Sequence, residues 1–275
     1  MGKLIILSGP SGVGKGPLVD TLKIYLNSIG KQLKKHVLYT TRKLKKGEVH
    51  GETYWYSYLM NVDKSKHNAI VYVRNNAETE LELIYQKAKN KGEDFLKFSV
   101  REEQNQGINF SELHKELKED DNVVLLEIYQ EKVERVVSFC NDNGFETKIV
   151  FISPLSDEDY ETYGCFNDKE RAIATEATMT VKLRSREREN EDKIKERART
   201  AIKEVEEARK RRDKEEYIVN HFGEDMKTAW ATLQERVGKA PEYYEYGKST
   251  FSLTEEIDKT FRQFLEQVFP ELINA

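Results

Sequence analysis

A glycine-rich loop near the start of the chain constrains its fold more than any other feature. Residues 9–17 read Gly-Pro-Ser-Gly-Val-Gly-Lys-Gly-Pro, which places Gly9, Gly14 and Lys15 in G-x-x-x-x-G-K spacing. An apolar run at residues 4–7 precedes the loop and an amphipathic stretch from residue 18 follows it, which predicts strand, turn and helix. Such glycines let backbone N–H groups face phosphate oxygens, and the helix dipole and the lysine add positive charge. The predicted phosphate-binding residues are Gly9, Pro10, Ser11, Gly12, Val13, Gly14, Lys15 and Gly16.

The loop departs from the usual motif directly after its lysine. That position normally holds Ser or Thr, whose hydroxyl binds magnesium. Here Gly16 and Pro17 follow Lys15, and neither residue has a hydroxyl. The departure bears on catalysis more than on phosphate binding, because the glycines and the lysine that would hold the phosphates are all present.

Length and composition narrow the classes of protein to consider. The 275 residues suffice for one large domain or for a core with inserted subdomains. A formal net charge of −4 gives no overall case for nucleic-acid or membrane binding, and no apolar run approaches the roughly 20 residues of a membrane helix. Cys140 and Cys165 are too few for a disulfide framework or a metal site, so we expect free thiols in a reducing compartment. Residues 4–7 are too short for a signal peptide, and we expect a cytoplasmic monomer or homodimer.

Apolar patterns along the chain predict strands that alternate with helices. This alternation is typical of a mostly parallel sheet with right-handed crossovers, in which a ligand binds at the carboxyl ends of the strands. The loop at residues 9–15 follows one such strand end. The expected strands cover residues 4–7, 36–39, 53–58, 70–73, 95–100, 122–128 (central in the sheet), 148–152 and 215–220, and the expected helices include residues 110–118, 130–143, a long amphipathic one within 182–216, 225–237 and 253–268.

Three groups of cations could neutralise a phosphoryl group in transfer, a reaction that needs positioning and positive charge. Lys15 is the first, and Arg42 with Lys45 is the second. On charge alone, a solvated turn explains the second group equally well. The third group lies in a segment that mixes Glu and Arg residues, a pattern that favours a solvent-exposed helix. The third group comprises Lys182, Arg184, Arg186, Arg188, Arg197 and Arg199.

Two motifs in succession resemble the guanylate kinase family. The glycine loop is followed by Thr40-Thr41-Arg42 and then by Gly47-Glu48-Val49-x-Gly51-x-x-Tyr54. Later segments resemble the family in the same order, so that the resemblance covers roughly residues 3–237 with gaps. It implies an α/β P-loop three-layer fold with a mostly parallel sheet, an inserted nucleoside-monophosphate-binding subdomain and a lid. The later matching segments are residues 124–128, 151–156, 182–204 and 217–220.

The resemblance also implies a division of the chain into domains. The P-loop kinase core would comprise residues 1–35 and 119–237, with the lid at about 155–197, and residues 36–118 would form the inserted subdomain. Residues 238–275 lie beyond the resemblance and read as a helical appendage. Its one-sided apolar face favours packing on its own core over self-association.

Roles for individual residues follow from the resemblance. It implies ATP and Mg²⁺ as cofactors and small-molecule nucleotides as partners. Lys15, Lys182, Arg186 and Arg197 would be catalytic, and Asn220 would lie near adenine. Arg42, Lys45 and Tyr54 would bind the phosphate of the acceptor, and Glu127 could help to hold the metal. The implied acceptor-binding set is Tyr39, Arg42, Lys45, Tyr54, Glu127 and Tyr129.

Departures from the family pattern leave three hypotheses for function. Tyr39 stands where the family usually has a serine that helps to read guanine, and Tyr129 replaces an acid that also reads guanine. Insertions at about 75–106 and 157–180 interrupt the resemblance. The first hypothesis is a kinase for a nucleoside monophosphate, with GMP or dGMP as the default acceptor. The others are a kinase for another phosphorylated acceptor and a non-catalytic guanylate-kinase-like binding module.

Overall fold

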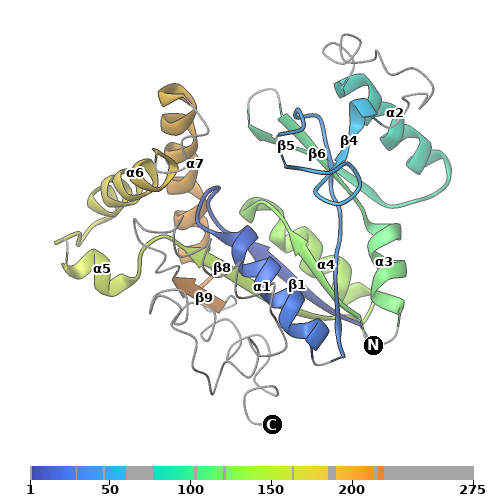
Figure 1. Cartoon of the computed structure of the whole chain (residues 1–275), viewed down its shortest axis with the longest axis horizontal. Coiled ribbons are helices and arrows are strands. Elements are labelled where there is room, and N and C mark those ends of the chain that lie inside the picture. Colours follow the sequence, from blue (N-terminus) through green and yellow to red (C-terminus); the bar gives the residue numbers. More distant parts are fainter. Residues whose placement is uncertain are drawn as a thin grey trace. The chain divides into compact units, whose positions relative to one another are not determined.

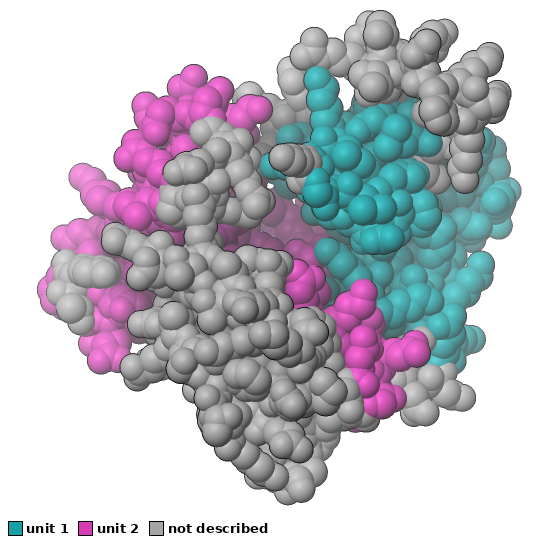
Figure 2. Space-filling view, in the orientation of Figure 1, with its two compact units in different colours: residues 1–2, 34–126 teal, residues 3–33, 127–275 magenta. Residues whose placement is uncertain are grey.

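The computed structural model describes most of the chain up to residue 219. The described residues are 2–28, 30–45, 47–59, 77–101, 104–119, 122–162, 164–184, 190–212 and 216–219. The predicted strand at 70–73 and the predicted helices at 225–237 and 253–268 lie outside this set, as do the predicted site residues Arg186 and Asn220. By its contacts the chain divides into two compact units, residues 1–2 with 34–126 and residues 3–33 with 127–275 (Figure 2).

A five-stranded sheet has the order β2-β7-β1-β8-β9. Its strands are β2 (Gln32–Lys35), β7 (Asn122–Glu127), β1 (Lys3–Ser8), β8 (Glu146–Ser153) and β9 (Glu216–Val219). β8 pairs in parallel with both β1 and β9, with Leu7 opposite Val150 and Val150 opposite Glu216. The apolar run of β1 is fully buried, as expected for a parallel strand covered on both faces. The fold is therefore mixed α/β with a mostly parallel sheet, as a P-loop three-layer fold requires.

The second unit holds the helices that lie next to β1 and β8 (Figure 1). α1 (Lys15–Ser28) follows β1, and α4 (Val133–Asp142) precedes β8. α7 (Glu191–Lys210) packs on β8 through Val205 and Ala208, which contact Phe151. These contacts fix α7 relative to the strand that lies beside β1.

Two helices fill the insertion that was expected at residues 157–180. They are α5 (Asp157–Thr162) and α6 (Asp168–Arg184). α6 packs along α7, and small alanines on α7 allow a close approach. The buried cluster between them consists of Met179, Leu183, Ile194, Ala198 and Ala201.

The first unit contains a four-stranded sheet of order β4-β3-β6-β5. β6 (Gln104–Asn109) pairs antiparallel with β3 (Tyr39–Thr40) and with β5 (Phe95–Arg101), and β3 pairs in parallel with β4 (Trp55–Tyr56). α2 (Ala77–Asn90) buries Leu81 and Ala88 against Phe95 and Tyr39. The N-cap of α3 (Phe110–Lys118) is Asn109, whose side-chain oxygen accepts from the N–H groups of Ser111 and Glu112.

Several expected elements differ from those of the structure. The strand expected at 36–39 is replaced by β2, which ends at Lys35, and β3, which begins at Tyr39. The residues between them form no ladder, because the His36 N–H donates to the Leu125 carbonyl while the Leu38 carbonyl accepts from the Trp55 N–H. Most of the strand expected at 53–58 is absent, because a 3₁₀ turn, η1 (Ser57–Leu59), follows β4 at once. The expected central strand, β7, is an inner strand, and β1 is the middle one.

Two further expectations can be compared with the structure. Cys140 and Cys165 are free thiols, as predicted, and both are buried. Among the described helices, none is both long enough and apolar enough to cross a membrane.

Candidate active site

The glycine loop joins the last residue of β1 to the first residue of α1. Gly9, Gly12 and Gly14 have φ angles of 133°, 101° and 103°, which side-chain-bearing residues rarely adopt. A Cβ added to Gly9 would lie 2.4 Å from the Ile152 carbonyl oxygen. The turn closes with a 3.1 Å hydrogen bond from the Val13 N–H to the Pro10 carbonyl. The loop thus leads directly into the N-terminus of α1, the kind of position at which proteins commonly bind anions.

Lys15 lies over the backbone of the loop. Its ammonium group donates to the carbonyl of Gly9 and, at 3.0 Å, to the carbonyl of Pro10. Gly16 is exposed in the first turn of α1, and an added Cβ there would meet no atom within 4 Å. The charge of Lys15 therefore lies at the loop, as the sequence predicts, and the position after it has open space.

The two described lid cations of the prediction lie in different surroundings. Arg197 of α7 is half-buried, and its Nη2 donates to the Ser11 hydroxyl of the loop. Burial lowers the pKa of Lys182 of α6 to about 8, although the nearby carboxylate of Asp159 in α5 works in the opposite direction. The structure thus brings Arg197 to the loop and places Lys182 within reach of the charge of Asp159.

Glu127 ends β7 beside the start of the loop. The N–H of the next residue, Ile128, donates to the Leu7 carbonyl at 3.1 Å, which aligns this strand end with the end of β1. Glu127 and Tyr129 are both half-buried. Within the described ranges, no group of three or more His, Cys, Asp and Glu side chains is arranged to hold a metal ion. Glu127 is therefore a single predicted ligand that would need the oxygens of a nucleotide to complete a metal site.

A second cluster surrounds Arg42 in the first unit. Its Nη1 and Nη2 donate to the two carboxylate oxygens of Glu48, each at 2.7 Å. The guanidinium carbon lies 4.6 Å from the ring centre of Tyr54 and 5.5 Å from that of Tyr56. The Tyr56 hydroxyl also donates to Glu48, at 2.6 Å. The orientation of Arg42 is thus fixed by a carboxylate and two aromatic rings.

In this cluster Arg42 and Glu48 each stabilise the ionised form of the other. Burial works to raise the pKa of Glu48, but hydrogen bonds from Arg42, Tyr56 and the Lys45 N–H outweigh it and lower the pKa to about 2. The pKa of Arg42 is raised, because the bond to Glu48 more than offsets its burial. Burial and the bond to Glu48 raise the pKa of Tyr56. The sequence motif contains Glu48, but residue types alone did not reveal that Glu48 and Tyr56 hold Arg42.

Tyr39 and Lys45 occupy contrasting positions in the same unit. The ring of Tyr39 is buried, with its centre 5.4 Å from that of Phe95, and its hydroxyl donates to Glu112 at 3.2 Å. Burial, followed by the charge of Glu112, raises the pKa of Tyr39. The side chain of Lys45 is exposed. Acceptor binding by Tyr39 and Lys45 stays a prediction.

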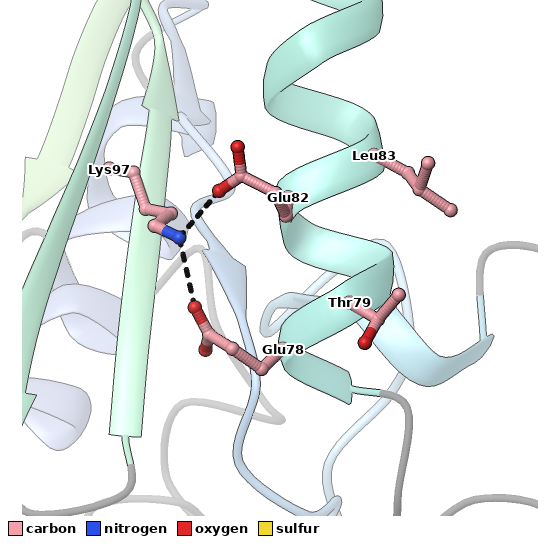
Figure 3. Close-up of a pocket in the computed structure, with 5 residues that line it drawn as sticks. All are labelled: Glu78, Thr79, Glu82, Leu83 and Lys97. Carbon is pink, nitrogen blue, oxygen red and sulfur yellow. Dashed lines mark hydrogen bonds and ion pairs between the residues drawn. The ribbon is translucent and has the colours of Figure 1, made fainter.

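A shallow pocket of about 330 Å³ lies on the first unit, and none of its lining residues is a predicted site residue. Lys97 of β5 donates to Glu82 at 2.7 Å and to Glu78 at 2.9 Å (Figure 3). Thr79 and Leu83 of α2 complete the lining and point away from this ion-pair network. The charged groups pair with one another and tie β5 to α2, so we assign this pocket no ligand.

Comparison with known proteins finds similarity to guanylate kinases in the N-terminal part of the chain. Residues 1–77 match the protein family described as "Guanylate kinase". The chain is 46% identical over 55 residues to the guanylate kinase of Blochmanniella floridana, a match that covers 20% of this chain and 25% of that protein. It is 43% identical over 76 residues to the guanylate kinase of a Nostoc species, covering 26% of this chain and 31% of that protein. The crystal structure of guanylate kinase from Anaplasma phagocytophilum aligns with 98% of this chain and 96% of its own, with 17% identity and a TM-score of 0.44.

The phosphate loop and the α/β fold define the class as a P-loop protein. The resemblance to guanylate kinases is confirmed over residues 1–77, which carry both signature motifs. The matched stretches span about a quarter to a third of the length of these two relatives.

Proposed function

We propose that this protein transfers the γ-phosphoryl group of ATP to the phosphate of a nucleoside monophosphate, with GMP or dGMP as the default acceptor. The observation that carries the proposal is the phosphate loop between β1 and α1, with three positive-φ glycines and the ammonium of Lys15 over its carbonyls. The guanylate kinase match of residues 1–77 supports the acceptor class.

The residues divide the work between two phosphate sites. The backbone N–H groups of the loop and Lys15 would bind the phosphates of ATP, and Arg197 would neutralise charge on the group in transfer. Arg42, packed on Tyr54, would bind the phosphate of the acceptor. Mg²⁺ carried by the nucleotide would neutralise charge on its phosphates, with Glu127 as its protein ligand. Transfer would be direct and in line, because phosphoryl transfer needs positioning more than covalent chemistry.

The decisive experiment is a coupled ADP-release assay with ATP, Mg²⁺ and a panel of all ribo- and deoxyribonucleoside monophosphates. Lys15→Ala should lower turnover at least about 100-fold, because it removes the fixed charge beside the phosphates. Lys23→Ala, which changes an exposed lysine of the same helix, is the matched control. Turnover that survives Lys15→Ala unchanged would refute the role of the loop. Turnover on one acceptor would identify the base.

A second candidate function is a non-catalytic module that binds phosphorylated ligands. Gly16-Pro17 favours it, because this loop has no hydroxyl after its lysine. The same assay separates the two candidates. ATP binding without turnover on any monophosphate would favour the module, or a kinase for an acceptor outside the panel.

A further inference from the structure

Ser11 offers its hydroxyl to a residue far away in the sequence. It lies in the turn that the Val13 N–H and the Pro10 carbonyl close, and Gly12 and Gly14 supply the positive φ angles of the loop. The loop geometry therefore does not require a hydroxyl at residue 11. The Ser11 oxygen accepts a hydrogen bond from Nη2 of Arg197, 186 positions further along the chain.

Packing within the second unit places Arg197 independently of this bond. Its neighbours Ile194 and Ala198 are buried against α6, so the register of this part of α7 is set by apolar contacts. A long arginine side chain still has several rotatable bonds, and packing of the helix alone does not fix its guanidinium. The Ser11 hydroxyl supplies a restraint at the end of the side chain.

We propose that Ser11 is a positioning residue, whose hydroxyl fixes the guanidinium of Arg197 at the rim of the phosphate loop, where it would meet the γ-phosphoryl group. This inference rests on the proposed kinase function. A guanidinium has five N–H donors, so it can donate to Ser11 and to phosphate oxygens together. A cation held in place beforehand needs no reorganisation when charge develops, and small misplacements reduce rates strongly.

A double-mutant cycle tests this role. Ser11→Ala should lower kcat by about 10- to 100-fold, the range expected for a hydrogen bond to a charged group, while KM for the acceptor changes less than about threefold. Ser11→Thr keeps the hydroxyl and should retain most of kcat. In an Arg197→Ala background, Ser11→Ala should have no further effect. Additive effects of the two substitutions, or a threonine variant as impaired as the alanine variant, would overturn the proposal.

A binding measurement keeps this test separate from the proposed function. If the wild-type protein turns over no monophosphate, the kinase proposal fails. The wild type, Ser11→Ala, Arg197→Ala and the double variant are then compared by their affinity for a fluorescent ATP analogue. Non-additive losses of affinity would show that Ser11 acts through Arg197 at the phosphates. Additive losses, or no loss with either substitution, would overturn the positioning role. Thermal unfolding of each variant, expected to match that of the wild type, confirms that the loop remains folded.

Discussion

Glu48 accepts hydrogen bonds from the guanidinium of Arg42 with both carboxylate oxygens, at 2.7 Å each. Both side chains are largely buried, with 14% of Arg42 and 20% of Glu48 exposed. This planar, two-bond geometry is one that arginine can form and lysine cannot. The predicted acceptor-phosphate residue is therefore oriented in advance, and the pair leads to three predictions.

Glu48→Gln should destabilise the protein by about 1.5–3 kcal/mol, the range for hydrogen bonds to charged groups. Glutamine keeps the shape of the side chain but loses the charge that pairs with Arg42, and Tyr56 loses a carboxylate acceptor. Urea unfolding at pH 7 measures the change. Glu52→Gln, at an exposed position in the same motif, is the control and should leave stability unchanged. Equal stability of the two variants would show that the pair contributes nothing.

The same variant predicts a dependence on pH. The pKa of Glu48 is lowered from 4.5 to about 2 in the folded protein, so its ionised form stabilises the fold above the unfolded pKa. That contribution is fully present above about pH 5 and is lost as pH falls from there toward 2. The stability difference between the wild type and Glu48→Gln should therefore shrink between pH 6 and pH 3. A difference that stays constant over this range would contradict the assignment.

Arg42→Lys should raise KM for the acceptor by about 10- to 100-fold while KM for ATP stays within about twofold. Lysine keeps the charge but loses the paired donors and the flat face that lies 4.6 Å from the Tyr54 ring. Steady-state kinetics with each substrate varied in turn gives both constants. Lys43→Ala removes an exposed neighbouring charge and serves as the control. A larger effect on ATP than on the acceptor would place Arg42 at the wrong phosphate.

The phosphate loop and its setting were predictable from local pattern. An apolar strand, a glycine turn and a helix need only neighbouring residues to be recognised, and the structure has them as β1, the loop and α1. The helix predicted at 110–118 is confirmed as α3. The long helix predicted within 182–216 is observed as α7, which covers Glu191–Lys210. Their strong 3.6-residue periodicity explains this success.

Other features depended on tertiary contacts that no local pattern contains. The resemblance predicts Tyr39 as an acceptor contact, but no local pattern shows that its ring packs in a core with residues of α2 and β5. α6 was not predicted, because its apolar residues lie on more than one face: Met179 is buried, while Ile173 and Val181 are exposed. The hydrogen bonds from Arg42 to Glu48 span a turn in which Gly47 has a φ of 85° and the Glu48 N–H donates to the Lys45 carbonyl.

Gly9→Ala should be far more damaging than the same change at another positive-φ glycine. At Gly9 the new Cβ would lie 2.4 Å from the Ile152 carbonyl oxygen. This oxygen belongs to the β8 backbone, which cannot move aside without disturbing the sheet. At Gly30 a Cβ meets nothing within 4 Å, so only backbone strain of about 1 kcal/mol is expected. Thermal unfolding and ATP binding should both show the contrast. Similar losses for both variants would mean that strain alone explains the glycine at residue 9.

Gly16→Ser should restore the hydroxyl that the loop lacks after Lys15. The position has room, because an added Cβ meets no atom within 4 Å, and it lies in the first turn of α1 next to the glycine loop. If the loop binds Mg²⁺ with ATP, the serine should lower the Mg²⁺ concentration that gives half-maximal activity several-fold. Gly16→Ala is the control, since it stabilises the helix by up to about 1 kcal/mol without supplying a metal ligand. The contrast between serine and alanine therefore isolates the hydroxyl from the gain in helix stability. An identical Mg²⁺ dependence in the two variants would show that this loop holds its nucleotide without a metal contact at residue 16.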